Sequence, residues 1–213
     1  MNILIIGATG QVGQLTTDAA LAAGHSVTAF GRSTDKIDAP RDRLSVFSGD
    51  VLKLADVREA MDGQDVVILT FGAPMNADTL LHEPDLCKDG TAHVVDAMAD
   101  AGVKRLVCQT MIGVGNSKDH GRFIFRNLIR PVLLGRIAED REAQEEIVRS
   151  SYTQWTIVRP TELNDDAQTG GYRVLEDLEG VTAKTIARAD VAEFLVKVAE
   201  DDNTIGRTYL ITQ

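Results

Sequence analysis

The sequence has few cysteines: Cys87 and Cys108 are the two among 213 residues. Two thiols are too few for a disulfide framework of the kind that stabilises small secreted domains. Cys108 also lies in an apolar run, which favours a buried thiol. We therefore expect two free cysteines in a reducing compartment and a cytoplasmic protein.

The sequence also lacks an excess of basic residues and a long apolar run. Lysine and arginine total 22 against 32 aspartate and glutamate, a formal net charge of −10. Binding to nucleic acid depends on cations that neutralise phosphates, so this charge argues against it, although a few clustered arginines still attract an anionic ligand. No stretch approaches the roughly 18 apolar residues that span a bilayer, and the N-terminal apolar run ends at Gly7 without signal-peptide features. We expect neither a nucleic-acid nor a membrane partner.

Metal-ligand and hydrolase motifs are missing as well. The histidines, at His25, His82, His93 and His120, show no metal-ligand spacing, and the cysteines add none. The sequence has neither a Gly-x-Ser-x-Gly elbow nor a P-loop lysine after its glycine turn. We expect no metal site, and hydrolase chemistry of the nucleophile-elbow type is disfavoured.

What is present is an alternation of short apolar runs with longer helical ones. The patterns predict strands over 2–6, 26–30, 44–47, 66–70, 105–108, 156–158 and 208–211, and helices over 11–23, 54–61, 89–101, 138–149 and 190–200. Several strands are apolar throughout, as parallel strands buried on both faces are. The strand–helix–strand order predicts an α/β fold of Rossmann type: a doubly wound parallel sheet with helices on both faces. No linker divides the chain, so we expect a single domain, 1–213.

Two segments interrupt this rhythm, about 111–136 and 161–181, and insertions beyond the later strands of such a sheet build its substrate side. Within the first, residues 120–130 mix phenylalanine with arginine. On a helix, Arg122, Arg126 and Arg130 would share one face and attract a phosphorylated or carboxylated aromatic. The alternative is an ordinary amphipathic helix whose arginines are solvated or paired.

A glycine turn directly follows the first strand and opens the first helix. It comprises Gly7, Ala8, Thr9, Gly10, Gln11, Val12 and Gly13. In this G-x-x-G-x-x-G spacing one glycine makes a tight turn, one lets the backbone approach a pyrophosphate, and one permits close helix–strand packing. The pyrophosphate rests on unpaired N–H groups at the helix N-terminus. The turn predicts a dinucleotide site, against the alternative of a plain βα turn.

The second strand ends in a basic rather than an acidic residue. Sites that prefer NAD usually place Asp or Glu here to hold the ribose 2′-hydroxyl, whereas an arginine accommodates a 2′-phosphate. Arg32 occupies this place, and Ser33 adds a hydroxyl donor. We therefore predict NADP as the cofactor, with NAD left open. The alternative is that Arg32 is a solvated loop residue.

The chain resembles the atypical short-chain dehydrogenases/reductases, in particular the NAD(P)H-binding branch of flavin reductase/biliverdin reductase B-like and NmrA-like proteins. The resemblance covers almost the full length. Its markers are the glycine turn, Arg32, and the segments 49–51, 71–73, 156–160 and 189–192. The resemblance implies that Asp50 and Val51 lie against the adenine and that Phe71, Gly72 and Ala73 pass along the cofactor ribose. It also puts substrate contacts at Thr161, Glu162 and Leu163. As alternatives, Asp50 caps the helix near Leu54 and Phe71 belongs to the core.

The catalytic Tyr-x-x-x-Lys pair of this broad group is not matched. Alignment back from residues 156–160 puts Ile137 at the Tyr position and Arg141 at the Lys position. Isoleucine moves no proton, and arginine binds ribose or phosphate but is a poor acid; alternatively, Arg141 pairs with Glu145 on the surface. Thr110 matches the family's Ser/Thr, so its hydroxyl would orient a substrate carbonyl or the nicotinamide amide, unless it only ends the strand.

Three functions fit these residues. The first is an NADPH-dependent oxidoreductase that transfers hydride to a small flavin-, quinone- or tetrapyrrole-like acceptor, because such transfer needs mainly stacking and orientation. The second is a non-catalytic NAD(P)-binding sensor or scaffold of NmrA type. The third is a sugar-nucleotide epimerase or dehydratase, which the missing Tyr-x-x-x-Lys pair disfavours. The sequence leaves the oligomeric state open.

Overall fold

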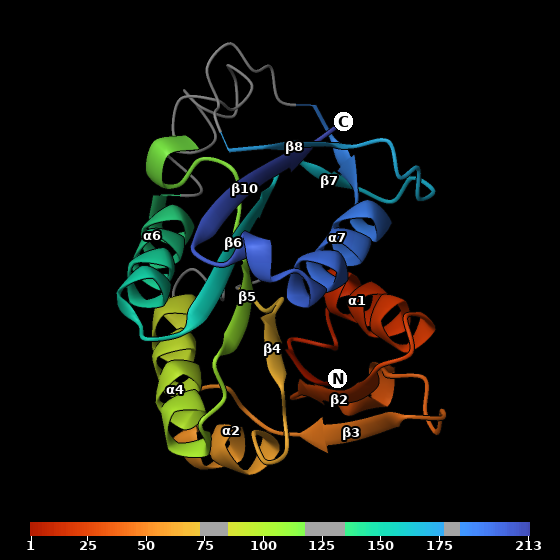
Figure 1. Ribbon diagram of the computed structural model, residues 1–213, viewed down its shortest axis with the longest axis vertical. Coiled ribbons are helices and arrows are strands. Elements are labelled where there is room, and N and C mark those ends of the chain that lie inside the picture. The colour runs from red at the N-terminus through yellow and green to blue at the C-terminus, as the bar shows by residue number, and fades with distance from the viewer. Residues whose placement is uncertain (73–84, 118–134, 177–183) are drawn as a thin grey trace.

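The computed structural model describes residues 1–72, 85–117, 135–176 and 184–213. Within them an eight-stranded sheet forms the centre of the molecule, in the order β3-β2-β1-β4-β5-β6-β10-β8 (Figure 1). Its strands are β1 (Asn2–Ile6), β2 (Ser26–Gly31), β3 (Leu44–Ser48), β4 (Val66–Leu69), β5 (Arg105–Gln109), β6 (Gln154–Pro160), β8 (Arg173–Leu175) and β10 (Arg207–Thr212). The chain winds outward from β1 in both directions, so the β1–β4 boundary is the topological switch point.

The sheet is parallel except at one edge. All of its pairs are parallel apart from β10 with β8, which is antiparallel and sets Leu210 opposite Leu175. The doubly wound parallel sheet is therefore confirmed. The edge strand β8 was not predicted, since it is short and lies inside the segment 161–181 expected to be irregular. Two further short strands, β7 (Leu163–Asn164) and β9 (Ile186–Ala187), pair in parallel beside the main sheet.

Helices cover both faces of the sheet, as predicted (Figure 1). They are α1 (Gln11–Ala22), α2 (Leu54–Ala60), α4 (Leu86–Ala101), α6 (Gly135–Ser150) and α7 (Arg188–Glu200). The strands explain the two layers because alternate side chains point to opposite faces. In β1, Ile3 and Ile5 join the core under α1 and α7, while Leu4 and Ile6 join the core under α2 and α4. Runs that are apolar throughout therefore supply both cores.

The start of α4 is set by a contact distant in sequence. The pattern predicts the helix from residue 89, but it begins at Leu86. Asp140, a buried residue of α6, accepts hydrogen bonds from Cys87 N at 2.9 Å and from Lys88 N at 2.8 Å. A carboxylate at unpaired N–H groups stabilises the first turn of a helix. The added turn of α4 thus depends on α6.

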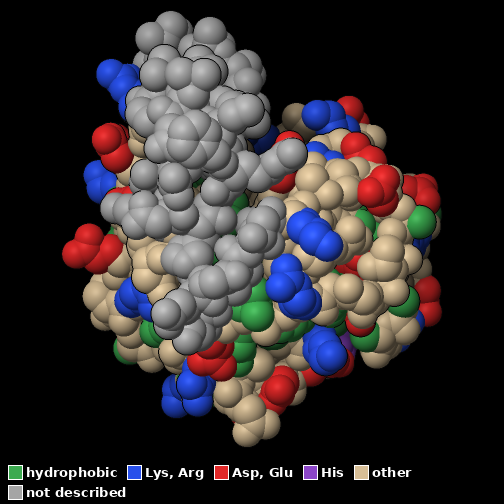
Figure 2. Space-filling view, turned by 90° about the horizontal axis from the view of Figure 1, so that it is seen from above, with side chains coloured by type: hydrophobic (Ala, Val, Ile, Leu, Met, Phe, Trp, Pro, Cys, Tyr) green, Lys and Arg blue, Asp and Glu red, His purple; other side chains and the backbone are tan. Residues whose placement is uncertain are grey.

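The face seen in Figure 2 carries side chains of both charges, and several Lys and Arg side chains lie close together near its centre. None of the helices in the described part of the chain combines the length and the apolar character that crossing a membrane requires. Cys87 and Cys108 are free and buried, and burial raises the pKa of the Cys108 thiol.

We expect Asp140→Ala to lower the free energy of unfolding by about 2 kcal/mol, because two N–H groups of α4 lose a charged acceptor. Urea denaturation measures this difference. Glu139→Ala is the matched control, since Glu139 is the neighbouring acid of α6 but is exposed, and we expect a change within about 0.5 kcal/mol. Equal losses in the two variants would contradict the capping role of Asp140.

Candidate functional site

The glycine turn lies at the switch point and leaves the start of α1 open. Gly7 has φ +95°, and its N–H and that of Ala8 both donate to Phe30 O at 3.1 Å. Gly10 is the N-cap of α1, and no side chain caps this helix end. The first N–H groups of α1 are therefore available to an anion.

The close approach of three backbone segments explains the glycines. A methyl group built on Gly13 would overlap Gly7 O, and one on Gly7 would overlap the backbone of Phe71. Gly31 packs in the same way against the side chain of Thr9. The turn thus fits between β2 and the residues after β4 only with glycine at these positions.

A cleft of about 320 Å³ opens above this turn, and we call it the switch-point cleft. Its lining combines the ends of β1, β2, β3 and β4: Ile6, Gly7, Thr9, Gly10, Phe30, Gly31, Arg32, Ser33, Lys36, Gly49, Asp50, Val51, Thr70, Phe71, Gly72 and Leu86. Most of the residues that the sequence assigned to the cofactor are therefore brought together in one hollow. Gln11, Val12 and Gly13 form the first turn of α1 immediately beside it. Ala73 lies outside the described residues.

One end of the cleft is basic. Arg32 and Ser33 line it as the sequence predicted, and both are exposed there. Lys36, which ends the short 3-10 turn Thr34–Lys36, lines the same end and was not among the predicted residues. The sequence did contain a signal for Lys36, because it follows Arg32 by four residues. Together these residues put two cationic side chains and a hydroxyl at this end of the cleft.

The opposite wall of that end is a turn held by α2 and α4. Asp50 Oδ1 accepts from Leu52 N at 3.0 Å, and Asp50 N donates to Asp56 Oδ2 at 2.9 Å. Asp50 is thus not the cap of α2, whose N-cap is Lys53. His93 of α4 contacts Val51 O through Nδ1 at 3.0 Å and fixes the turn from behind. No pattern in the sequence marked His93 for this role.

Phe71 belongs to the core, as one of the alternatives held, and its contact with the cofactor ribose stays a prediction. It is buried in the core with Val51 and Leu86, and its edge lines the switch-point cleft. Beyond it, Gly72 lies against the guanidinium of Arg141, so that a methyl group at Gly72 would overlap Nη2. At Gly72 the lining of the cleft therefore contacts α6.

The buried face of α6 is polar. Arg141 is buried and donates through Nη1 to Gln109 O at 3.2 Å and to Gln144 Oε1 at 2.7 Å. Gln144 Nε2 donates in turn to Thr91 Oγ1 of α4 at 2.9 Å. The alternative of an exposed ion pair between Arg141 and Glu145 is wrong, because Arg141 points inward and Glu145 pairs with other arginines.

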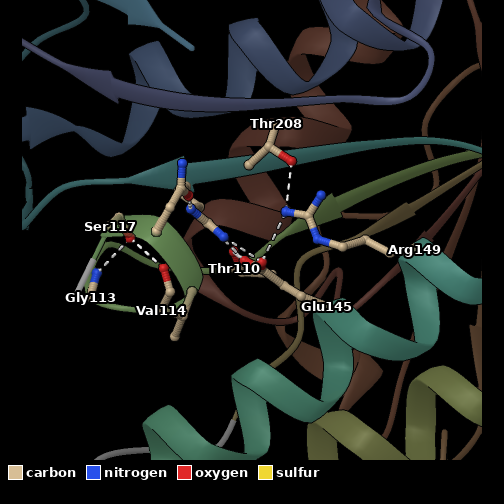
Figure 3. Close-up of polar contacts among 9 residues, drawn as sticks. Thr110, Gly113, Val114, Ser117, Glu145, Arg149 and Thr208 are labelled. Carbon is tan, nitrogen blue, oxygen red and sulfur yellow. Dashed lines mark hydrogen bonds and ion pairs between the residues drawn. The ribbon is translucent and has the colours of Figure 1, made fainter. Parts of the chain in front are cut away.

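Glu145 is the centre of a second buried cluster (Figure 3). Arg159 of β6 donates to it through Nε at 2.9 Å and Nη2 at 2.6 Å, and Thr110 Oγ1 donates to Glu145 Oε1 at 2.7 Å. Arg149 adds a longer contact of 3.3 Å. Burial raises the pKa of Glu145, but the hydrogen bonds and charge of Arg159, with Thr110, outweigh burial and leave this pKa below its usual range. The cluster is therefore ionised near neutral pH.

The hydroxyl of Thr110 is already used in a hydrogen bond within this cluster. Its one proton goes to Glu145, so Thr110 can only accept a further hydrogen bond. An orienting contact to a substrate carbonyl, which needs a donor, does not fit this arrangement.

The turn after β5 is also joined to Arg159, which donates to Asn116 Oδ1. This turn is closed by Ser117 Oγ, which accepts from Gly113 N at 3.0 Å (Figure 3).

A larger hollow of about 730 Å³ lies between α6 and β10, and we call it the α6–β10 groove. Its lining includes Glu142, Glu146 and Arg149 of α6 and Thr208 of β10, where Arg149 Nη2 donates to Thr208 Oγ1 at 2.8 Å. The described lining of this groove includes neither the Gly7–Gly13 turn nor the uncapped start of α1. The chemistry of a dinucleotide therefore fits the smaller switch-point cleft better.

The segment after β6 is tied to α7. Asp190, a fully buried carboxylate, accepts from Thr169 N, Thr169 Oγ1 and Gly170 N at 2.8–2.9 Å. Thr161 is buried beside the end of β6, and its hydroxyl has no hydrogen-bond partner. Residues 118–134 and 177–183 lie outside the described residues, and with them the arginine-rich segment 120–130 and His120. The substrate side over 111–136 and 161–181 thus stays a prediction.

Metal ligands do not gather in the described chain. Across residues 1–72, 85–117, 135–176 and 184–213, no three His, Cys, Asp or Glu side chains are grouped as a metal would need. His25 Nε2 contacts Glu200 at 2.9 Å and His93 contacts Val51, while His82 lies outside these ranges.

The switch-point cleft and the sheet order together define an atypical short-chain dehydrogenase/reductase of the NAD(P)-binding branch. The chain belongs to the NAD(P)H-binding family, whose model matches residues 7–202. The sequence resemblance is thereby confirmed, and NAD(P)H is the cofactor of the family.

Individual relatives agree with this assignment. The chain is 28% identical over 222 residues to the uncharacterized sugar epimerase YhfK of Bacillus subtilis, covering 100% of this chain and 94% of that protein. A short-chain dehydrogenase/reductase from Veillonella parvula, solved in complex with NADP, has a TM-score of 0.81 at 20% identity, with 100% and 94% of the two chains covered. ChuY, an anaerobillin reductase from Escherichia coli O157:H7, has a TM-score of 0.82 at 23% identity, covering 100% and 97%.

The buried Glu145–Arg159 pair predicts a pH-dependent stability. Glu145→Gln leaves the buried charge of Arg159 without a counter-ion, so we expect the free energy of unfolding at pH 7 to fall by about 3 kcal/mol. Because the pKa of Glu145 is lowered in the folded state, its stabilisation is present above the unfolded pKa of about 4.3 and is lost as the pH falls further. The difference between wild type and variant in urea denaturation should therefore shrink below about pH 4. A difference that stays constant with pH would contradict the ionised pair.

Proposed function

We propose that the protein is an NADPH-dependent reductase that transfers hydride to a small conjugated acceptor of flavin, quinone or tetrapyrrole type. The observation that carries the proposal is the switch-point cleft, where an uncapped helix start, a basic end and glycine-lined walls meet. Its glycines let the turn, β2 and the residues after β4 approach one another closely at the start of α1, which is the packing expected of a dinucleotide-binding turn. NADPH supplies the hydride when it is bound.

Different residues of the cleft would bind different parts of the dinucleotide. The first turn of α1, with Thr9 and Gly10, would hold the pyrophosphate by backbone N–H groups and the helix dipole. Arg32, Ser33 and Lys36 would hold the 2′-phosphate, which NADH lacks. The turn of Asp50 and Val51 would face the adenine.

The far end of the cleft would hold the nicotinamide half. Phe71 and Gly72 would pass along its ribose, and Arg141, beside Gly72, stands where the wider group has its lysine. Arg141 would bind and orient through its guanidinium. It would not act as an acid, because its pKa is too high.

The groups that surround this end favour a conjugated acceptor. Ile137 is buried at the position of the missing tyrosine, and the proton of Thr110 is engaged with Glu145. Neither of these two groups supplies a proton to a substrate oxygen, so the proposed reaction takes its proton from solvent. Reduction of a flavin, quinone or bilin meets this condition, since hydride transfer there depends mainly on stacking and orientation. The anaerobillin reductase among the structural neighbours has the same fold.

The same observations leave a second candidate, a non-catalytic NAD(P)-binding sensor. It is favoured by the absence of an acid at position 137 and by the internal bonding of Thr110 and Arg141. The name of the Bacillus relative adds a sugar epimerase as a third. Turnover separates all three: net NADPH oxidation marks the reductase, binding alone marks the sensor, and a modified sugar nucleotide without net oxidation marks the epimerase.

The direct test mixes purified protein with NADPH and a panel of flavins, quinones and biliverdin, and follows the loss of NADPH absorbance. We expect turnover with at least one conjugated acceptor and none with simple ketones or aldehydes. The control without protein gives the chemical background. Tight NADPH binding with no acceptor reduced above that background would overturn the reductase in favour of the sensor.

Cofactor preference has its own test. Arg32→Ala removes a charge-assisted contact to the 2′-phosphate, so we expect NADPH affinity to fall about tenfold or more, with NADH affinity changed less than about twofold. Arg58→Ala is the matched control, because Arg58 pairs with Asp100 on the surface and does not line the cleft. Titration calorimetry measures both cofactors. Equal losses for NADPH and NADH would remove the 2′-phosphate role of Arg32.

A further inference from the structure

One buried amide at the end of β5 has an unused hydrogen-bonding atom. Gln109 is 7% exposed, and its Oε1 is buried without a hydrogen-bond partner. Leaving such a group unpaired is unfavourable, so an orphaned buried polar atom calls for a partner that binds there. Neither the fold nor the cofactor assignments above use this side chain.

Gln109 ends the strand next to β4, and the residues that follow β4 line the switch-point cleft. In the β4–β5 register Leu69 is opposite Cys108, which sets Gln109 level with Thr70, a residue that lines the cleft. Arg141 joins the two strand ends, since it donates to Gln109 O and its guanidinium lies against Gly72. The end of β5 therefore lies next to the end of the cleft at Thr70 and Gly72, although the described lining of the cleft itself stops at these residues.

The side chain of Gln109 is also on the appropriate face of the sheet. Val107 belongs to the core under α1 and α7, and Cys108 to the opposite core. Because side chains alternate along a strand, Gln109 shares the face of Val107. This is the face on which the open N-terminus of α1 lies, so a dinucleotide that runs from α1 toward β5 would bring its nicotinamide end to Gln109.

We propose that the Gln109 side chain binds the carboxamide of the nicotinamide ring, with Oε1 accepting from the carboxamide N–H. A primary amide both donates and accepts, so the two groups are complementary in shape and polarity. Thr110 supports the same choice, because its oxygen can only accept while its proton is held by Glu145. The end of β5 thus offers acceptors to a ligand that donates. The inference rests on the cofactor site of the proposed function but not on turnover.

Among the described residues, Thr161 Oγ1 is also buried without a partner and lies at the end of the neighbouring strand β6, whereas the other two such atoms lie elsewhere. Gln64 Oε1 also lacks a partner, but Gln64 lies just before β4, at the amino-terminal end of that strand rather than at its carboxyl end. There its Nε2 donates to Thr28 Oγ1 and Asp62 O. Arg105 Nε belongs to a guanidinium at the start of β5 that is held by Thr204 and by backbone carbonyls. Gln64 is therefore a natural control for Gln109.

The test compares NADP with its 3-acetylpyridine analogue, in which a methyl ketone replaces the carboxamide and no N–H remains. Dissociation constants are measured by titration calorimetry without any acceptor, so the result does not depend on catalysis. We expect wild type to prefer NADP by about tenfold, and Gln109→Met to bring this ratio near one while the analogue binds about as before. Gln109→Asn keeps an amide but shortens the side chain by one methylene, so it should also lower the preference for NADP over the analogue. This second variant keeps the test valid if the methionine variant does not fold.

Gln64→Met should leave the ratio at its wild-type value, since it makes the same substitution at an orphaned amide outside the cleft. The inference is overturned by a wild-type protein that does not distinguish the two dinucleotides, or by a preference that survives in both Gln109 variants. Either result can occur in a protein that still reduces an acceptor, so it would leave the proposed function standing. Conversely, a protein that shows the Gln109-dependent preference but no turnover would support the inference and not the reductase.

Discussion

The open N-terminus of α1 at the divergence of β1 from β4 is the constraint on which the rest of the site depends. A helix start without a side-chain cap has N–H groups that need an acceptor. Gly7 and Gly13 are required here, because a side chain on either would overlap the backbone of Phe71 or of the turn itself. The ends of β2, β3 and β4 then line a cleft around this point, and under the proposed function its basic end at Arg32 would set the direction of the dinucleotide.

The second organising element is the buried polar face of α6. Asp140 extends α4, Arg141 joins the ends of β4 and β5, and Glu145 joins β5 to β6 through Arg159. A helix that elsewhere in the wider group carries a tyrosine acid here carries fixed charges that are satisfied internally. This exchange of a proton donor for a scaffold is the basis on which we propose conjugated acceptors rather than ketones, since their reduction needs orientation more than acid catalysis.

Local sequence patterns predicted most of the helices and strands and, within the candidate site, the glycine turn and the place of Arg32. The helix and strand positions, the glycine turn and the place of Arg32 follow from periodicity and spacing within short windows. Contacts between distant segments were not predictable in this way: the earlier start of α4 depends on Asp140, and the pairing of Glu145 with Arg159 rather than Arg141 depends on how α6 is turned toward the sheet. His93 and Gln109 carry no motif at all, because their roles arise from which strand end or turn they meet in the folded chain.

A crystal structure of the protein with NADP tests the central claim most directly. The account predicts the pyrophosphate on the N–H groups of the first turn of α1, the 2′-phosphate beside Arg32 and Lys36, and the nicotinamide beyond Gly72 at the end of β5. A dinucleotide found instead in the α6–β10 groove, or one in the switch-point cleft with its two halves reversed, would contradict it.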